Sequence, residues 1–336
     1  MDCFVGEEIG GYLVDKLIGK GGFGCIYSVY DNDSGIQYAM KTEIIVCNRS
    51  TLAREIAFLK TLQGSPMFPR LIKTGENDKV RYLVMELLGN SIAKVKERFP
   101  GKKIPFETSI RASMYMLKCI QQLHMRGIIH RDIKPGNFLI RGDNKYPMVL
   151  IDFGLACFYV DVESGVHLPA RDDRSFAGTA AYASPHSLMG EDISRRDDIY
   201  SWFLSMIEMI NGKLPWDSIP KNNLVDFRNK ISKKQLCNKL PVQIRTIYDM
   251  IAKLEFDETP DYSGLIDVLS STLQLSNACE SNHLVLDLLG ESYSNPDYSL
   301  RKHPSFTNLI EVSCTDSNNS QKNKNVEMNC SRCRVS

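Results

Sequence analysis

Three polar side chains between residues 130 and 137 have the types and spacing needed for catalysis at a hydroxyl group. The segment reads H-R-D-I-K-P-G-N, so Lys134 follows Asp132 by two residues and Asn137 follows it by five. A carboxylate such as Asp132 can accept a hydroxyl proton, and an Asn oxygen can hold Mg²⁺ on nucleotide phosphates. Lys134 can neutralise charge on a phosphoryl group during its transfer. The pattern predicts phosphoryl transfer; the alternative is a surface turn without chemistry.

A second acid follows a short apolar segment. Asp152 begins the triplet D-F-G directly after the run M-V-L-I at 148–151, which is expected to be a buried strand. Hard cations such as Mg²⁺ prefer carboxylate and phosphate oxygens as ligands. The triplet alone occurs by chance. Its position shortly after Asn137 and at the end of a strand predicts that Asp152 is the main magnesium ligand and Asn137 another.

The glycine-rich segment 19–24, G-K-G-G-F-G, is ambiguous by itself because dinucleotide-binding folds use the same spacing. In those folds the segment follows a strand and opens a helix. Here strand-like alternation at 12–18 and 25–30 flanks it on both sides, which predicts a β-hairpin. Glycine lets a backbone approach phosphates closely. This hairpin is therefore expected to cover the phosphates of a nucleotide.

Lys41 and Glu55 are expected to complete the phosphate site. The sequence predicts a strand over 37–40 that ends at Lys41, and a helix over 50–62 with Ser50 as its N-cap. Glu55 would project toward the sheet and pair with Lys41, whose ammonium group would contact the α- and β-phosphates. The alternative is that both side chains are simply solvated.

A further strand is expected over 80–85, and residues 86–89 after it are interpreted as a hinge whose backbone binds the edge of an adenine ring. Met85 would lie beside the adenine pocket; the alternative is that it is an ordinary core residue. The predicted nucleotide-binding residues are Ile18, Gly19, Lys20, Gly21, Gly22, Phe23, Gly24, Ile26, Ala39, Lys41, Glu55, Met85, Glu86, Leu88 and Leu139.

The second half of the chain is predicted to be mainly helical. A helix over 109–126 carries an apolar stripe that indicates core rather than a site. A second helix over 199–210 begins at Asp198. The Asp198 carboxylate is expected to accept hydrogen bonds from the backbone of the segment 130–137, as a supporting group.

Composition sets limits on the class of protein. The 336 residues are 43% hydrophobic and 24% charged, with a net charge of +1, which predicts a globular chain without a general affinity for nucleic acid. The ten cysteines show no pairing pattern, which indicates a reducing compartment. The N-terminal residues carry acids and no apolar run, so no secretory signal is expected, and no apolar stretch is long enough to span a bilayer.

In order and spacing, these motifs resemble a eukaryotic protein kinase domain over residues 12–275, and Lys134 followed by Pro135 is the serine/threonine form. Four segments are similar to the casein kinase 1 superfamily: G-T-A-A-Y-A-S at 178–184, S-R-R-D-D at 194–198, L-P-W at 214–216 and P-D-Y at 260–262. Trp202 and Phe203 look more like its tau-tubulin kinase branch, or like a divergent relative.

The resemblance implies an α+β, two-lobed fold. A small, mainly antiparallel β N-lobe with one key helix would cover about 12–85, a hinge 86–89, and a larger, mainly α C-lobe 90–275. It also implies ATP with Mg²⁺, transfer to Ser or Thr hydroxyls of proteins, and activity that does not depend on phosphorylation of the activation segment, 155–184. The Thr179 hydroxyl would reach Asp132 and Lys134, which makes these three the predicted catalytic residues.

One departure from the casein kinase 1 pattern bears on substrate choice, while the missing A-P-E glutamate is itself characteristic of that group. Ala181 replaces the usual Arg that helps bind acidic or phosphate-primed substrates, and a methyl group cannot hold an anion. Compensation by other arginines stays open; the candidates are Arg171, Arg174, Arg195 and Arg196. The usual A-P-E triplet is S-P-H at 184–186, so another group must anchor this segment.

Residues 276–336 are interpreted as a largely flexible tail, in which 284–289 packs back on the C-lobe. Cys330 and Cys333 form a lone C-x-x-C, which is a weak zinc or redox signal. Cys333 also begins a C-terminal C-R-V-S, which fits a farnesylation pattern with Cys330 as a palmitoylated second signal. The alternative is an unmodified end.

The sequence therefore predicts a serine/threonine protein kinase of the casein kinase 1 type. A pseudokinase scaffold is the alternative, and loss of Lys41, Asp132, Asn137 or Asp152 would favour it, but all four are present. The chain is expected to act as a monomer on protein substrates, in the cytoplasm and also in the nucleus. It would bind no nucleic acid and would associate with membranes only if its C-terminal Cys is lipidated.

Overall fold

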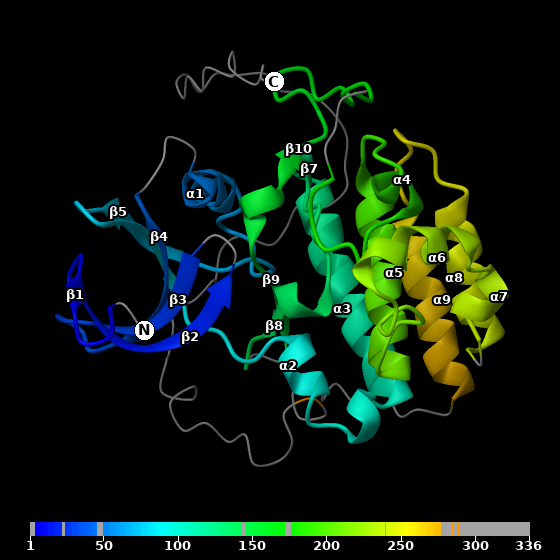
Figure 1. Cartoon of the computed structure of the whole chain (residues 1–336), viewed down its shortest axis with the longest axis horizontal. Coiled ribbons are helices and arrows are strands. Elements are labelled where there is room, and N and C mark those ends of the chain that lie inside the picture. Colours follow the sequence, from blue (N-terminus) through cyan, green and yellow to red (C-terminus); the bar gives the residue numbers. More distant parts are fainter. Residues whose placement is uncertain are drawn as a thin grey trace. The chain divides into compact units, whose positions relative to one another are not determined.

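A computed structural model describes residues 4–21, 24–45, 50–142, 145–171, 176–238 and 240–276, together with Leu284 and Leu288. Five residues singled out from the sequence, Gly22, Phe23, Arg174, Cys330 and Cys333, lie outside these ranges. The chain divides into two compact units, 1–294 and 295–336, and only the first contains described residues. Within it a β-rich first part is followed by a helical second part (Figure 1), which confirms the predicted α+β kinase fold.

The regular elements comprise strands, α-helices and short 3₁₀ helices. The strands are β1 (Glu8–Ile9), β2 (Tyr12–Gly21), β3 (Gly24–Asp31), β4 (Gln37–Ile44), β5 (Leu71–Glu76), β6 (Val80–Glu86), β7 (Ile128–Ile129), β8 (Phe138–Ile140), β9 (Met148–Leu150) and β10 (Cys157–Phe158). The α-helices are α1 (Thr51–Thr61), α2 (Ile92–Lys96), α3 (Phe106–His124), α4 (Pro185–Leu188), α5 (Arg195–Asn211), α6 (Leu224–Lys230), α7 (Lys233–Leu236), α8 (Val242–Ala252) and α9 (Tyr262–Leu275). The 3₁₀ helices are η1 (Pro100–Lys102), η2 (Pro135–Asn137), η3 (Phe153–Leu155) and η4 (Lys221–Asn223).

Strands β1 to β6 form one antiparallel sheet with the order β1-β2-β3-β4-β6-β5. Alternate side chains point to opposite faces of a strand, so β4 serves two apolar cores. Met40 belongs to a small core with Tyr27 and Val84, whereas Ala39 belongs to the main core. The sheet starts before the predicted boundary at residue 12, because β1 pairs with β2.

The register of the sheet places Lys41 inside β4 and not at its end, where the sequence predicts it. Lys41 lies opposite Ile26 of β3 and Leu83 of β6, and pairing with β6 continues to Ile44. The strand β5 has no counterpart among the predicted elements. Glu86, predicted as the first hinge residue, is still part of β6, because its amide donates to the Arg70 carbonyl.

Helix α1 is fixed to β4 at its N-terminus. The predicted N-cap Ser50 is confirmed, since its hydroxyl accepts a hydrogen bond from the Ala53 amide at 2.9 Å. The Glu43 carboxylate accepts from the Thr51 amide at 2.9 Å and from the Leu52 amide at 3.3 Å. Because Glu43 lies two residues after Lys41, these bonds also set the position of the helix that carries Glu55.

The second part of the fold packs α3 against α5, α9 and β9, and α8 contacts both α5 and α9 (Figure 1). Leu284 and Leu288 are buried in the same core, as expected for a tail segment that returns to the C-lobe. None of the helices in the described ranges combines the length and the apolar character needed to cross a membrane.

The predicted bounds of α3 and α5 differ from the structure. Helix α3 spans 106–124 and not 109–126: it starts directly after Pro105 and stops shortly before Gly127, which has a φ of 73°. Helix α5 spans 195–211 and not 199–210, and the Asp197 carboxylate caps its first turn by accepting a hydrogen bond from the Ser194 amide at 2.7 Å. Asp198 therefore lies in the first turn of α5 and does not begin it.

Candidate active site

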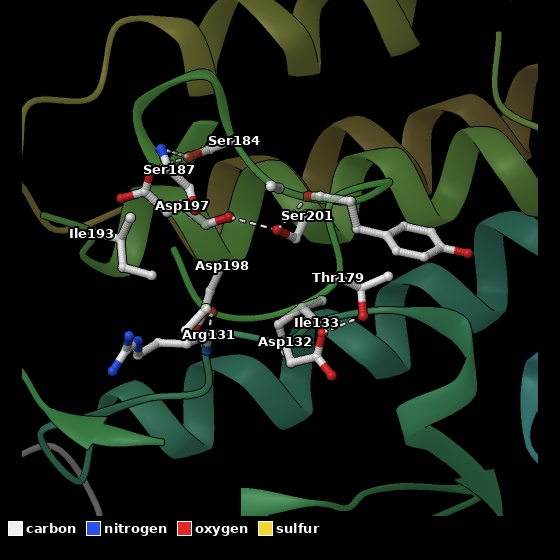
Figure 2. Close-up of a pocket in the computed structure, with 13 residues that line it drawn as sticks. Arg131, Asp132, Ile133, Thr179, Ser184, Ser187, Ile193, Asp197, Asp198 and Ser201 are labelled. Atoms are coloured by element: carbon white, nitrogen blue, oxygen red, sulfur yellow. Dashed lines mark hydrogen bonds between the residues drawn. The ribbon is translucent and has the colours of Figure 1, made fainter. Parts of the chain in front are cut away.

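The three predicted catalytic side chains lie together. Lys134 Nζ is 2.6 Å from Asp132 Oδ2 and 2.9 Å from Thr179 Oγ1. The Thr179 hydroxyl donates to Asp132 Oδ1 at 2.7 Å (Figure 2). Asn137 Nδ2 donates to the Asp132 carbonyl at 2.8 Å. The carboxylate of Asp132 is thus oriented by a cation and a hydroxyl, which is the geometry that a proton acceptor for a substrate hydroxyl requires.

The backbone of this loop is held by Asp198, as the sequence predicts. Asp198 Oδ2 accepts from the His130 amide at 2.7 Å and Oδ1 accepts from the Arg131 amide at 2.9 Å. Arg131 has a φ of 71°, which is strained for a residue with a side chain. The charge-assisted hydrogen bonds from these two adjacent amides to Asp198 stabilise this backbone conformation. Asp198 therefore determines the direction in which the Asp132 side chain points.

A buried histidine fixes Asp198 in turn. His124 Nε2 is 2.9 Å from Asp198 Oδ2, and His124 Nδ1 is 2.6 Å from the Tyr262 hydroxyl. Burial lowers the pKa of His124, although the hydrogen bond to Asp198 opposes this. A neutral ring that donates from Nε2 and accepts at Nδ1 satisfies both partners. Burial alone would raise the pKa of Asp198, but hydrogen bonds from His124 and the His130 amide outweigh it and lower that pKa.

The ion pair predicted between Lys41 and Glu55 is present. Lys41 Nζ is 2.6 Å from Glu55 Oε2 and 3.0 Å from Asp152 Oδ1. Burial alone would lower the pKa of Lys41, but the charges of Glu55 and Asp152 outweigh it and raise that pKa. The lysine is therefore a fixed cation between two carboxylates, at the position where phosphate groups would have to be held.

Asp152 and Asn137 fit the oxygen chemistry of a divalent cation. Burial would raise the pKa of Asp152, but the charge of Lys41 outweighs it and lowers that pKa, so the carboxylate stays ionised. Asp152 has a φ of 70°. With Arg131, it is one of three non-glycine residues with positive φ in the described ranges. Asn137 is buried, and its Nδ2 already donates to Asp132, so its oxygen is the atom that could serve as a ligand.

The structure brings together only some of the residues predicted for the adenine pocket. Ala39 and Met85 are cross-strand partners in the main core, and Ile26 packs against that core, whereas Ile18 is 44% exposed. The Glu86 carboxylate accepts hydrogen bonds from Arg141 and from the Arg70 amide, so its predicted role in nucleotide binding would fall to its backbone. The roles of Gly19, Lys20, Gly21, Gly24, Leu88 and Leu139 in nucleotide binding stay predictions.

The end of the activation segment is anchored without the usual glutamate. Four consecutive carbonyls, those of residues 180–183, each accept a hydrogen bond from a side chain of the helical part. Arg228 donates to the Ala180 and Ala183 carbonyls, Trp216 to that of Ala181 at 3.0 Å, and Ser201 to that of Tyr182 at 2.7 Å. These hydrogen bonds take the place of the A-P-E anchor.

Close approach of two segments requires glycine at 178. Gly178 has a φ of 105°, and a Cβ there would lie 2.5 Å from the Arg131 carbonyl oxygen. A pocket beside this contact, between the catalytic loop and the start of α5, is lined by Arg131, Thr179, Ser184 and Asp197 (Figure 2). The contact brings Thr179 within reach of Asp132.

Three of the four arginines proposed to replace the missing anion site make internal contacts, and the fourth, Arg174, lies outside the described residues. Arg195 donates to Thr259 and to the Asp257 carbonyl, and its guanidinium lies 4.6 Å from the Tyr159 ring centre. Arg196 contacts Asp197 at 3.7 Å, and its side chain is 11% exposed. Arg171 pairs with Asp192 at 2.9 Å. The proposed compensation by Arg195 and Arg196 is therefore wrong, because both are consumed by internal contacts.

Several contacts of the site left no signal in the sequence, although Trp216 and Tyr262 belong to segments that carry the family resemblance. The anchors Ser201, Trp216 and Arg228 bind backbone carbonyls, which carry no sequence pattern. Tyr262 and His124 are far apart in the chain and meet only through packing. Only the missing glutamate after Pro185 indicated that another group had to anchor the activation segment.

The fold and site together are typical of a two-lobed phosphotransferase that uses a nucleotide. The family described as "Protein kinase domain" matches residues 12–281, and the chain belongs to this family. Its members use ATP and a divalent cation in general.

Among the relatives, a protein of Dictyostelium discoideum named as a probable serine/threonine-protein kinase is 34% identical over 78% of this chain and 53% of its own. Casein kinase I homolog 2 and casein kinase I homolog 1 of Saccharomyces cerevisiae are each 33% identical over 78% of this chain and 50% of their own. The chain thus spans about half the length of these relatives. The resemblance to casein kinase 1 is confirmed, while the tau-tubulin kinase branch stays a prediction.

We expect Gly178→Ala to separate the activation segment from the catalytic loop. The new methyl group would clash with the Arg131 carbonyl oxygen, and Ala would be strained at this positive φ. The free energy of unfolding should fall by about 2–3 kcal/mol, and the rate of phosphoryl transfer should fall at least about tenfold. Gly190→Ala is the matched control, because Gly190 has a φ of 79° but open space around it, so only about 1 kcal/mol should be lost. Urea unfolding of both variants measures the difference, and equal losses would contradict the close approach.

We expect Asp198→Asn to destabilise the catalytic loop. The Asn side chain keeps one acceptor oxygen but turns its NH₂ group toward a backbone N–H donor. The free energy of unfolding should therefore fall by about 3 kcal/mol. Because the pKa of Asp198 is lowered, its stabilisation is complete above its ordinary pKa of about 4 and is lost as pH falls through the lower folded value. Urea unfolding at neutral pH should show the full difference. Asp261→Asn, a change at an exposed N-cap where Asn serves equally well, should stay within about 0.5 kcal/mol.

Proposed function

We propose that the chain is a serine/threonine protein kinase that transfers the γ-phosphoryl group of ATP to Ser and Thr hydroxyls of proteins, with Mg²⁺ as the divalent cation. The observation that carries the proposal is the contact between Asp132, Lys134 and Thr179. Each of these side chains touches both of the others within 2.9 Å. Such an arrangement orients a hydroxyl and neutralises charge at one place, which is how phosphoryl transfer is catalysed.

The residues of the chain divide the chemistry between them. Asp132 accepts the proton of the substrate hydroxyl while the hydroxyl oxygen forms a bond to the γ-phosphorus of ATP. At the same time, the bond between that phosphorus and the leaving oxygen breaks. Lys134 neutralises charge on the transferred group, and Lys41, held by Glu55, binds the other phosphates. A bound Mg²⁺ would neutralise the phosphates, and Asp152 and Asn137 are the residues that would hold it.

The alternative of a pseudokinase scaffold has no support in the site. Lys41, Asp132, Asn137 and Asp152 are all present, and the pairs that orient Lys41 and Asp132 are formed. A scaffold without turnover would need neither pair.

Substrate choice follows from the missing anion site. Because Ala181 carries no charge, and because Arg171, Arg195 and Arg196 are engaged internally, we propose that phosphate-primed substrates have no advantage. We further propose that the chain acts as a monomer in the cytoplasm and nucleus. Membrane association would depend on lipidation of Cys333, with Cys330 as a second signal; both lie outside the described residues.

Transfer of ³²P from Mg·ATP to casein tests the function. We expect transfer by the unaltered chain and a loss of about a hundredfold or more in Asp132→Asn, because a general base contributes a factor of this order. A primed and an unprimed peptide should react at similar rates. Binding of Mg·ATP without transfer to any protein would contradict the kinase proposal and favour the scaffold. A strong preference for the primed peptide would contradict only the proposal on substrate choice.

A further inference from the structure

The residue that follows β8 joins the C-lobe to the start of the hinge. Arg141 comes directly after Ile140, the last residue of β8, and its Nη2 atom donates to Glu86 Oε1 at the end of β6. Its Nη1 atom donates to the Pro66 carbonyl, in the segment between α1 and β5. The Arg141 and Glu86 side chains are 15% and 17% exposed. One guanidinium group therefore holds both the first hinge residue and a segment of the N-lobe.

Glu86 is also held by the residue that precedes β5. Its Oε1 atom accepts from the Arg70 amide at 2.9 Å, and its own amide donates to the Arg70 carbonyl at 3.0 Å. The carboxylate thus accepts hydrogen bonds from a backbone amide and from a guanidinium group, and both donors restrict its position. An arginine suits this task, because the donors of its planar fork let one side chain bind a carboxylate and a carbonyl at once.

The far end of the hinge is tied to β8 by backbone hydrogen bonds. The Gly89 amide donates to the Ile140 carbonyl at 2.9 Å, and the Ile140 amide donates to the Asn90 carbonyl at 3.0 Å. A Cβ on Gly89 would lie 2.7 Å from the Ile140 carbonyl oxygen, so this close approach requires glycine. Two adjacent residues of the C-lobe, Ile140 and Arg141, therefore fix the two ends of the hinge, and residues 87–88 lie between these ends.

The strand β8 also carries a predicted nucleotide-binding residue. Leu139 pairs with Val149 of β9, and it lies two residues before Arg141. The hinge backbone would bind the edge of the adenine ring, so the space for the ring depends on the separation between the hinge and β8. Arg141 belongs to the segment that carries Leu139 and contacts the first hinge residue, so it fixes this separation.

We propose that Arg141 is a positioning residue for nucleotide binding, which holds the hinge backbone where it binds the adenine edge. This inference rests on the proposed kinase function and goes beyond it, because it assigns a role to an arginine that the proposed chemistry does not use. Without the guanidinium group, Glu86 would be a mostly buried, uncompensated carboxylate and would be drawn toward solvent. The hinge would then occupy arrangements that do not bind adenine, which lowers the apparent affinity for the nucleotide.

The first test removes the guanidinium group and keeps an aliphatic side chain. We expect Arg141→Met to raise the Kd for adenosine and the KM for Mg·ATP about tenfold each, as for a competent hinge that is about one-tenth populated. The kcat at saturating Mg·ATP should stay unchanged, because saturation restores the competent arrangement. A merely structural role would lower the thermal unfolding midpoint but leave the Kd and KM of the folded protein as they were. Adenosine binding is therefore measured well below that midpoint.

A double-mutant cycle shows whether Arg141 acts through Glu86. Glu86→Gln keeps an acceptor for the Arg70 amide but loses the charge, so it should raise the Kd for adenosine about threefold. The double variant should bind adenosine no more weakly than Arg141→Met alone. Arg141→Lys, which keeps the charge without the planar fork, should recover only part of the affinity. Lys233→Met, which removes the cation of the partly exposed pair with Asp249, is the matched control and should leave the Kd unchanged.

Adenosine binding separates failure of the positioning role from failure of the kinase function, because it requires no phosphate transfer. If Arg141→Met binds adenosine as tightly as the unaltered chain, the positioning role is wrong and the kinase function stands. Additive losses in the double variant would likewise overturn the link through Glu86. If the unaltered chain binds adenosine but transfers no phosphate, the kinase function fails, and weaker binding by Arg141→Met would still support the positioning role. If the unaltered chain binds no adenosine, the inference fails.

Discussion

The catalytic loop depends on one carboxylate. Asp198 accepts hydrogen bonds from the adjacent amides of His130 and Arg131, and so stabilises a backbone turn in which Arg131 has positive φ. The position of Asp132 follows from that turn. Because Asp198 is itself bonded to a neutral His124, which is bonded to Tyr262, the loop is tied to α3, α5 and α9 together. The rigid helical core thereby determines where the proton acceptor lies.

A second constraint is that three lysines in the described part of the chain are each held by a carboxylate. Lys41 lies between Glu55 and Asp152, Lys134 between Asp132 and Thr179, and Lys96 beside Glu208. Such pairs add little stability, but each fixes the distance between elements that are far apart in sequence. The lysines join the sheet to α1, the catalytic loop to the activation segment, and α2 to α5. Electrostatic contacts therefore hold the site in addition to the packing of the apolar core.

The sequence predicted the parts of the site that depend on local spacing or on standard motif order. Asp132 and Lys134 lie two residues apart on one loop, and Lys41 and Glu55 lie on neighbouring elements, so their pairing followed from motif distances. Helix ends were predicted less well: α5, for example, begins at Arg195, where Asp197 accepts a hydrogen bond from the Ser194 amide and caps the first turn. The anchors of the activation segment could not be predicted, since Arg228 and Trp216 bind backbone carbonyls that any residue carries. The pair of Lys96 and Glu208 joins positions 112 residues apart, and neither has a recognisable motif.

Because internal side chains assemble the site, we propose that activity needs no phosphate on the activation segment. The most direct test is single-turnover transfer from Mg·ATP to casein by protein whose activation segment is shown by mass spectrometry to carry no phosphate. We expect transfer at the full rate from the first turnover, without a lag. Transfer that begins only after a residue of the activation segment, 155–184, has been phosphorylated would contradict this proposal.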